Sequence, residues 1–210
     1  MPVPSLATRT ARSVATLGVL LLFWTVAAPA GSGQQGAAPP APLGQSEPLQ
    51  TGRPDFARML RQQAETDRTW RGAGDGFMQV EKIIYRSARG DLEIPAFVFQ
   101  PLRIRGARQH PALVWVHENI RGHLYEHYIP YIREATAQGF VVIAPEYRGS
   151  IGYGKAFYDA IDYGGAEVDD VVTAATVVAA RYPAVDPARI GIIGWSHGGQ
   201  IGRASCRERV

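Results

Sequence analysis

The sequence is poor in three features that mark particular classes of protein. Cys206 is the only cysteine among 210 residues, so the chain cannot form an internal disulfide. Between residues 31 and 200 it carries 17 basic and 18 acidic residues, a balance that leaves no basic patch for nucleic acid. The uncharged apolar stretch from Val14 to Ala28 is shorter than the ~20 residues of a membrane-spanning helix. We therefore expect no disulfide scaffold, no nucleic-acid binding and no stable membrane insertion.

The first 53 residues read as a targeting segment and a leader. Arg9 and Arg12 precede the apolar stretch, and Ala28-Pro29-Ala30 supplies the small residues of a cleavage site. Residues 1–30 are therefore predicted to be a signal peptide, and the mature protein is predicted to be secreted or periplasmic. An uncleaved anchor is the alternative, which the short apolar stretch disfavours. Residues 31–53 are rich in Gly, Pro, Ala and Gln, which predicts a flexible leader.

The last ten residues differ from the sequence before them. Residues 201–210 contain three arginines and the single cysteine, and they equal the translation of a common sequencing adapter. The adapter also accounts for the codon of Gln200. Residues 201–210 are therefore predicted to be an artefact, and no function is assigned to them.

Residues 54–76 are predicted to form a helical segment ahead of the catalytic domain. Pro54-Asp55 opens a helical pattern with Phe56, Met59, Leu60 and Ala64 on one face. A glycine-rich stretch, 72–76, ends the pattern.

Residues 77–200 alternate between strand and helix patterns. Residues 78–85 and 94–100 favour a hairpin, and residues 113–116, 140–144 and 189–195 are expected to be buried strands. Helices are expected over 125–138 and 166–182, and a long structured loop over 147–165. Strands alternating with helices predict a mostly parallel sheet covered on both faces. The expected fold is the N-terminal part of an α/β-hydrolase domain.

The strongest functional signal follows the third of these buried strands. Gly194-Trp195-Ser196-His197-Gly198 is a G-x-S-x-G motif between a strand and a helix start, the context of a nucleophile elbow. Such a turn exposes the serine hydroxyl at the N-terminus of a helix, where free N–H groups stabilise an oxyanion. Ser196 is therefore predicted to be the catalytic nucleophile.

Other candidate site residues lie in the elbow and in the loops near it. The backbone N–H of His197 is one expected oxyanion donor, and Glu118 and Asn119, in the loop after the first buried strand, are candidates for the second. Trp195, Tyr147 and Tyr153 are candidate substrate-pocket residues, although core packing explains them equally well. His117 and His123 lack a third ligand at suitable spacing, so no metal is predicted.

The remaining members of a catalytic triad are not expected in this sequence. In α/β-hydrolases the acid and the histidine follow the nucleophile in the chain, whereas His110, His117, His123 and His127 precede Ser196. His197 adjoins the serine and is expected to shape the pocket instead. We therefore expect the chain to be the N-terminal part of a longer enzyme. With an open sheet edge and no base, it should be inactive and prone to aggregate.

From about Asp91 to Gly199 the chain resembles the catalytic domain of the prolyl oligopeptidase family of serine peptidases. The resemblance rests on Pro145-Glu146-Tyr147-Arg148-Gly149-Ser150 with Gly152-Tyr153-Gly154, on Asp162-Tyr163-Gly164-Gly165 with Val168-Asp169-Asp170, and on Gly194-Trp195-Ser196-His197-Gly198-Gly199. It implies Ser196 as the acylated nucleophile and a peptide substrate. Where that family often has His-Gly-Gly-Pro, this chain has His117-Glu118-Asn119-Ile120, which is more similar to dienelactone hydrolases.

The predicted function is that of a secreted serine hydrolase acting through an acyl-enzyme. The resemblance favours a serine-type peptidase, and the His117-Glu118 start keeps a carboxylic ester hydrolase open. A hydrolase-fold protein that only binds its ligand is the third alternative, which the intact elbow disfavours. No cofactor is predicted, the substrate is a small peptide or ester, and the oligomeric state is not predicted.

Overall fold

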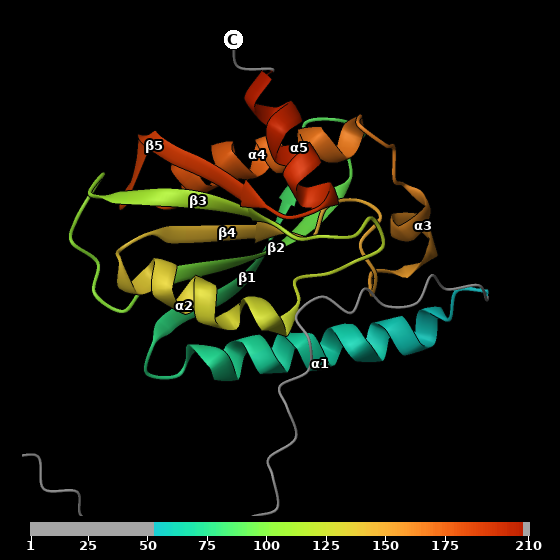
Figure 1. The fold of residues 1–210 in the computed structure, drawn as a ribbon, viewed down its shortest axis with the longest axis horizontal. Coiled ribbons are helices and arrows are strands. Elements are labelled where there is room, and N and C mark those ends of the chain that lie inside the picture. Colours follow the sequence, from blue (N-terminus) through green and yellow to red (C-terminus); the bar gives the residue numbers. More distant parts are fainter. Residues whose placement is uncertain (1–52, 208–210) are drawn as a thin grey trace, which may run out of the picture. The chain divides into compact units, whose positions relative to one another are not determined.

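The computed structural model describes residues 53–207 (Figure 1). The predicted signal peptide and all but the last residue of the predicted leader lie outside this range. Within it, no helix is long and apolar enough to cross a membrane. Along the chain the elements are α1 (Phe56–Gly74), β1 (Met78–Arg86), β2 (Glu93–Pro101), β3 (His110–Val116), the 3-10 turn η1 (Glu126–Tyr128), α2 (Ile129–Ala137), β4 (Val141–Pro145), α3 (Gly154–Asp159), α4 (Ala166–Arg181), β5 (Val185–Gly194) and α5 (His197–Arg207).

The five strands form one mixed sheet in the order β1-β2-β4-β3-β5. β1 pairs antiparallel with β2, and β2 pairs antiparallel with β4. β4, β3 and β5 run parallel, with β3 between the other two. Because the carboxyl ends of parallel strands meet at one edge of the sheet, the loops after β3, β4 and β5 converge there. The predicted hairpin and parallel strands are both confirmed.

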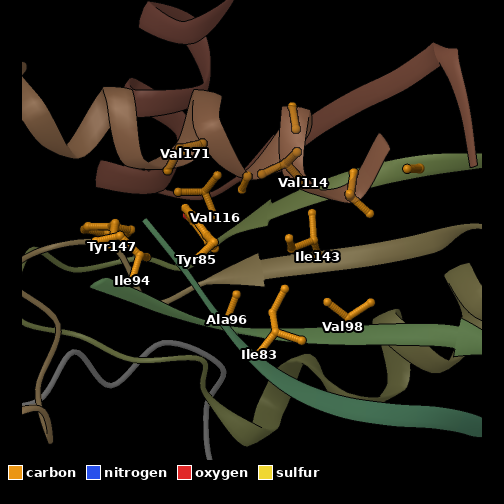
Figure 2. Close-up of a cluster of buried hydrophobic side chains, with 14 of the residues drawn as sticks. Ile83, Tyr85, Ile94, Ala96, Val98, Val114, Val116, Ile143, Tyr147 and Val171 are labelled. Carbon is orange, nitrogen blue, oxygen red and sulfur yellow. The ribbon is translucent and has the colours of Figure 1, made fainter. Parts of the chain in front are cut away.

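Helices cover both faces of the sheet, as predicted. In Figure 1, α1 and α2 lie along one face and α4 and α5 along the other. The α1–α2 side of the core is aromatic, with Trp70 packed 4.9 Å from Phe99 between ring centroids. The opposite side is mainly aliphatic (Figure 2), and its side chains come from β1, β2, β3, β4 and α4. The loops at the carboxyl edge are thereby supported by two separate packed layers.

Helix α1 forms where the sequence predicts it, but it buries a different face. Asp55 caps the helix by accepting from Arg58 N–H at 2.9 Å. Leu60 is 61% exposed and Ala64 is also exposed, so the predicted apolar face is wrong at both positions. The buried face instead contains two polar residues, Gln63 and Thr66. They are tolerated there because each forms a side-chain hydrogen bond, Gln63 with Asp67 and Thr66 with the polar loop after β3.

Strand β5 is more exposed than the buried strand that the sequence predicts. It pairs only with β3 among the described strands, and most of its residues are partly or fully accessible. An outermost strand has one free backbone edge, which explains this exposure. After β5 the chain forms α5, in which Ile201 is 2% exposed against α4 and the sheet. The adapter origin of residues 201–210 stays a prediction from the sequence.

Candidate active site

Ser196 lies in the sharp turn between the end of β5 and the start of α5. Its φ is +49°, in the left-handed region that a non-glycine residue adopts only under local constraint. Its side chain is exposed. The turn also requires glycine on both sides. A Cβ on Gly194 would lie 2.7 Å from Gly198 O, and a Cβ on Gly198 would lie 2.4 Å from Val116 O. The predicted nucleophile therefore has the geometry of a nucleophile elbow.

His197 begins α5 and contributes two different groups to the site. As the first helical residue, its backbone N–H has no acceptor within the helix, which suits an oxyanion donor. Its ring turns away toward α4 and the loop before it. Nε2 lies 4.0 Å from Glu167 Oε1, and the ring is 5.9 Å from that of Tyr163. The pKa of His197 is lowered by burial, and the nearby Glu167 carboxylate opposes this effect.

A pocket of about 260 Å³ is lined by His197, the residue after Ser196. Sequence reasoning did not find it. Its walls come from three segments: the turn before α4, the first turns of α4 and one face of α5. They are lined by Tyr163, Gly164, Glu167, Val168, His197, Gln200, Ile201 and Ala204. Spacing alone could not reveal it, because the pocket depends on how α4 and α5 pack.

The loop after β3 lies directly against the elbow. A Cβ on Gly198 would lie 2.6 Å from His117 O, so the first residue of the loop touches the turn. Glu118 Oε1 lies 3.4 Å from His127 Nε2, and Asn119 Nδ2 donates to the Tyr125 hydroxyl at 3.0 Å. Both side chains are thus used inside the loop and η1. Glu118 and Asn119 can therefore serve an oxyanion through their backbone N–H groups.

Trp195 packs within an aromatic cluster on the α2 side of the sheet. Its ring centroid lies 5.3 Å from that of Trp115, 5.4 Å from Tyr128 and 6.2 Å from Tyr131. Trp195 remains 40% exposed and Tyr131 49% exposed. The Trp195 ring therefore packs against the core on one side and is open to solvent on the other, and it directly precedes Ser196 in the chain. Burial, followed by the charge of Glu118, raises the pKa of Tyr128, so its hydroxyl stays protonated.

The structure buries one of the other two candidate pocket residues, Tyr147, and partly buries the second, Tyr153. Tyr147 is fully buried, and its hydroxyl lies 2.9 Å from Asn119 O, beneath the loop. Tyr153 packs 5.2 Å from Phe157, and Lys82 Nζ lies 5.2 Å from its ring centroid. The predicted substrate contact of Tyr147 is therefore wrong, because a side chain without accessible surface cannot touch a ligand. Tyr153 takes the packing role that its sequence context left open.

The described residues supply neither a general base nor a metal site. His110 bonds to Arg105 N and Gly139 O, and His117 bonds to Glu118 O and Ser150 Oγ. Residues 53–207 also contain no group of three or more His, Cys, Asp or Glu side chains that could hold a metal ion. The candidate site as described consists of Ser196 on its turn, backbone N–H groups at the start of α5 and in the loop after β3, and a pocket to which Ile201 and Ala204 of the predicted artefact also contribute.

A strained serine between a parallel strand and a helix, on a sheet of this strand order, defines an α/β-hydrolase fold. Within that fold, residues 127–207 match the model of the prolyl oligopeptidase family, which confirms the resemblance derived from the sequence. The chain is 32% identical over 139 residues to the uncharacterized peptidase YuxL of Bacillus subtilis, covering 61% of this chain and 20% of that protein. It is 29% identical over 119 residues to human dipeptidyl peptidase 8, covering 53% and 13%.

Solved structures share the fold. An acylaminoacyl peptidase of Pyrococcus horikoshii superposes with a TM-score of 0.54 at 19% identity, over 72% of this chain and 23% of that one. A puromycin-hydrolyzing peptidase of Mycobacterium tuberculosis superposes with a TM-score of 0.53 at 27% identity, over 60% and 20%. The chain thus spans about a fifth of the length of most of these peptidases.

Proposed function

We propose that this chain is the nucleophile-bearing part of a serine peptidase that acts through an acyl-enzyme on Ser196. The single observation that carries the proposal is the positive φ of Ser196 between two glycines that cannot bear a Cβ. A binding protein gains nothing from such a strained turn, whereas a nucleophile needs it to stand clear of the sheet. Peptidases among the relatives support a peptide bond as the target.

The proposed reaction follows from the groups at the carboxyl edge of the sheet. A histidine that follows Gly199 in the complete protein removes the proton from Ser196 Oγ, which attacks the carbonyl carbon of the substrate. Negative charge develops on the carbonyl oxygen, where the N–H groups of His197 and of the loop after β3 receive it. The same histidine protonates the leaving amine. Water then releases the acyl group and restores the serine.

Ester hydrolysis is the second candidate, because one feature of the site favours it. The loop after β3 begins with His117-Glu118, and the Glu118 side chain pairs with His127 at the rim. This differs from the His-Gly-Gly-Pro that the resemblance to the prolyl oligopeptidase family implies at this position. Paired substrates that share an acyl group and differ only in an amide or ester leaving group separate the two functions.

The decisive experiment begins with the gene. Sequencing past the codon of Gly199 is expected to show a frame that continues through further strands and helices to an Asp and then a His. The protein encoded by that frame should be labelled by a fluorophosphonate at Ser196 and should hydrolyse acyl-peptide amides. The Ser196→Ala variant is the control. A complete protein with no acid or histidine after the elbow, or one that labels equally with Ala at position 196, would contradict the proposal.

We also propose that the complete protein is exported from the cytoplasm. Support comes from the sequence alone, namely the arginines, apolar stretch and small residues of the first 30 positions. N-terminal sequencing of the mature protein should find a new terminus close to residue 31. An unprocessed Met1 in the cytoplasmic fraction would contradict export.

A further inference from the structure

Three consecutive carbonyl groups at the start of the loop 117–124 are held by buried side chains. The Tyr147 hydroxyl lies 2.9 Å from Asn119 O and 3.3 Å from His117 O. The carbonyl between them, Glu118 O, lies 2.8 Å from His117 Nδ1. The rings of His117 and Tyr147 stack at 4.2 Å, and neither residue is accessible to solvent. Two side chains therefore contact three successive carbonyl oxygens from the interior, with the single Tyr147 O–H proton shared between two of them.

The direction of these carbonyls fixes the direction of the following N–H groups. The described residues contain no cis peptide bond, and in a trans peptide the C=O and the next N–H point in opposite directions. The N–H groups of Glu118, Asn119 and Ile120 therefore point away from the buried rings. His117, where this segment begins, touches the elbow at Gly198. The outward N–H groups are thus presented beside the nucleophile.

We propose that Tyr147 is a positioning residue for the oxyanion hole. By contacting the carbonyls of His117 and Asn119 from below, its hydroxyl orients the N–H groups of Glu118 and Ile120, and the Glu118 N–H is the candidate donor to the oxygen of the substrate carbonyl. This inference rests on the proposed function and deepens it. It also explains why a tyrosine with no access to substrate lies at the end of a strand next to the active site.

The residue before Tyr147 anchors the far end of the same loop. Glu146 Oε1 accepts from Leu124 N–H at 3.0 Å, and Trp70 Nε1 on α1 donates to Leu124 O at 3.0 Å. Glu146 and Tyr147 follow directly after β4, which runs parallel to β3, so both reach the loop from the neighbouring strand end. The loop is consequently fixed at both ends by two adjacent residues.

A comparison of two buried tyrosines tests the proposal in the complete protein. Tyr147→Phe removes the hydroxyl and keeps the ring stack. Tyr85→Phe is the matched control, because Tyr85 is 2% exposed and its hydroxyl also donates to a backbone carbonyl, Asp170 O, at 2.6 Å. Loss of one oriented oxyanion contact lowers kcat about 100-fold or more, so a misdirected one should lower it about 10- to 100-fold in Tyr147→Phe with little change in KM. Tyr85→Phe should leave kcat within about twofold. Equal kcat in the two variants would overturn the positioning role.

A second measurement does not depend on catalysis. Hydrogen exchange at the amides of residues 118–122 should be faster in Tyr147→Phe than in Tyr85→Phe, because only the first variant removes a hydroxyl contact to the loop carbonyls. Glu146→Leu should accelerate exchange at the Leu124 amide, and Glu146→Gln should restore protection because it keeps an acceptor. Unchanged loop exchange in Tyr147→Phe would reject the inference. If Ser196 proves unreactive in the complete protein while exchange rises as expected, the proposed function fails and the control of the loop by Tyr147 stands.

Discussion

Arg148 and Asp170 form a buried, two-pronged ion pair that joins the loop after β4 to helix α4. Arg148 Nη2 lies 2.7 Å from Asp170 Oδ1, and Arg148 Nε lies 2.8 Å from Asp170 Oδ2. Asp170 also accepts from the Ser87 hydroxyl at 2.6 Å and from Arg148 N–H at 2.9 Å. The pair therefore ties together the β1–β2 turn, the β4 loop and α4, the three segments behind the active-site edge.

Removing one member of this pair should destabilise the protein strongly. Asp170→Ala leaves a buried guanidinium without its partner, so we expect a loss of about 3–5 kcal/mol in the free energy of unfolding. Asp159→Ala breaks an exposed pair with Lys155 on α3 and should cost less than about 1 kcal/mol. Urea unfolding followed by circular dichroism measures both. A similar cost in the two variants would show that the buried pair is no more than a surface contact.

Alanine at two glycine positions should have opposite effects. Gly198→Ala forces a Cβ against Val116 O and His117 O, both backbone atoms that cannot move aside, so we expect a loss of about 1–3 kcal/mol. Gly72→Ala adds a methyl group in α1 with no neighbour within 4 Å, and should stabilise the helix by about 0.5–1 kcal/mol. Thermal unfolding of the two variants decides this. A stabilising Gly198→Ala would mean that the elbow does not require close contact with β3.

The contributions of His117 and Glu146 to the pH dependence of the free energy of unfolding should cancel. Burial lowers the pKa of His117 to about 3 and raises the pKa of Glu146 to about 7. The charges of His123 and His197 lower the pKa of His117 further. The charge of Lys82 lowers the pKa of Glu146, and that of Asp67 raises it. Between about pH 4.5 and 6.5 the unfolded chain protonates the histidine, whereas the folded protein protonates the glutamate. The two states then bind equal numbers of protons, and this pair contributes no pH dependence.

Single substitutions should reveal the two opposing slopes. In Glu146→Gln only His117 remains, so stability should rise with pH across that window, by up to about 1.4 kcal/mol per unit. In His117→Gln only Glu146 remains, so stability should fall with pH by a similar amount. Urea unfolding at pH 5.0 and 6.2 measures the signs. Slopes of the same sign in both variants would contradict the assigned shifts.

Trp195 should contribute to stability and to an optical signal. Trp195→Ala removes a ring that is about half buried against Trp115 and Tyr128, with an expected cost of about 1–3 kcal/mol. The near-ultraviolet circular dichroism of the tryptophan pair should weaken in parallel. Leu60→Ala, at a 61% exposed position, is the control and should change stability by less than about 0.5 kcal/mol. An unchanged spectrum in Trp195→Ala would place this ring outside the cluster.

The parts of the fold that could be predicted are those with short-range signals. Apolar runs and glycine or proline stops located every strand and the longer helices, and the G-x-S-x-G motif located Ser196 on its turn. The buried face of α1 is not predicted because it carries two polar residues, Gln63, which bonds to Asp67 on the same helix, and Thr66, whose partners lie more than 50 residues away. A hydrophobic pattern cannot show a polar surface that is buried through hydrogen bonds.

The parts of the candidate site that are formed by adjacent residues could be predicted from the sequence. The parts that are formed by residues from distant segments could not. Ser196 and the His197 N–H follow from adjacent residues. For Tyr147 the sequence leaves substrate contact and core packing equally open, because an aromatic residue after a buried strand gives no indication of which way its ring turns. Its position is set by contacts with His117 and Asn119, about 30 residues earlier. The pocket beside Glu167 likewise arises only when α4 and α5 pack together.

The contact between Trp70 and Leu124 has a consequence for how this domain can be recombined. Trp70 is fully buried, and its indole donates to a carbonyl in the loop that borders the nucleophile. Helix α1 is therefore an integral part of the catalytic unit and not a spacer in front of it. A splice, fusion or proteolytic cut between α1 and β1 would detach a support of the loop while leaving the G-x-S-x-G sequence unaltered.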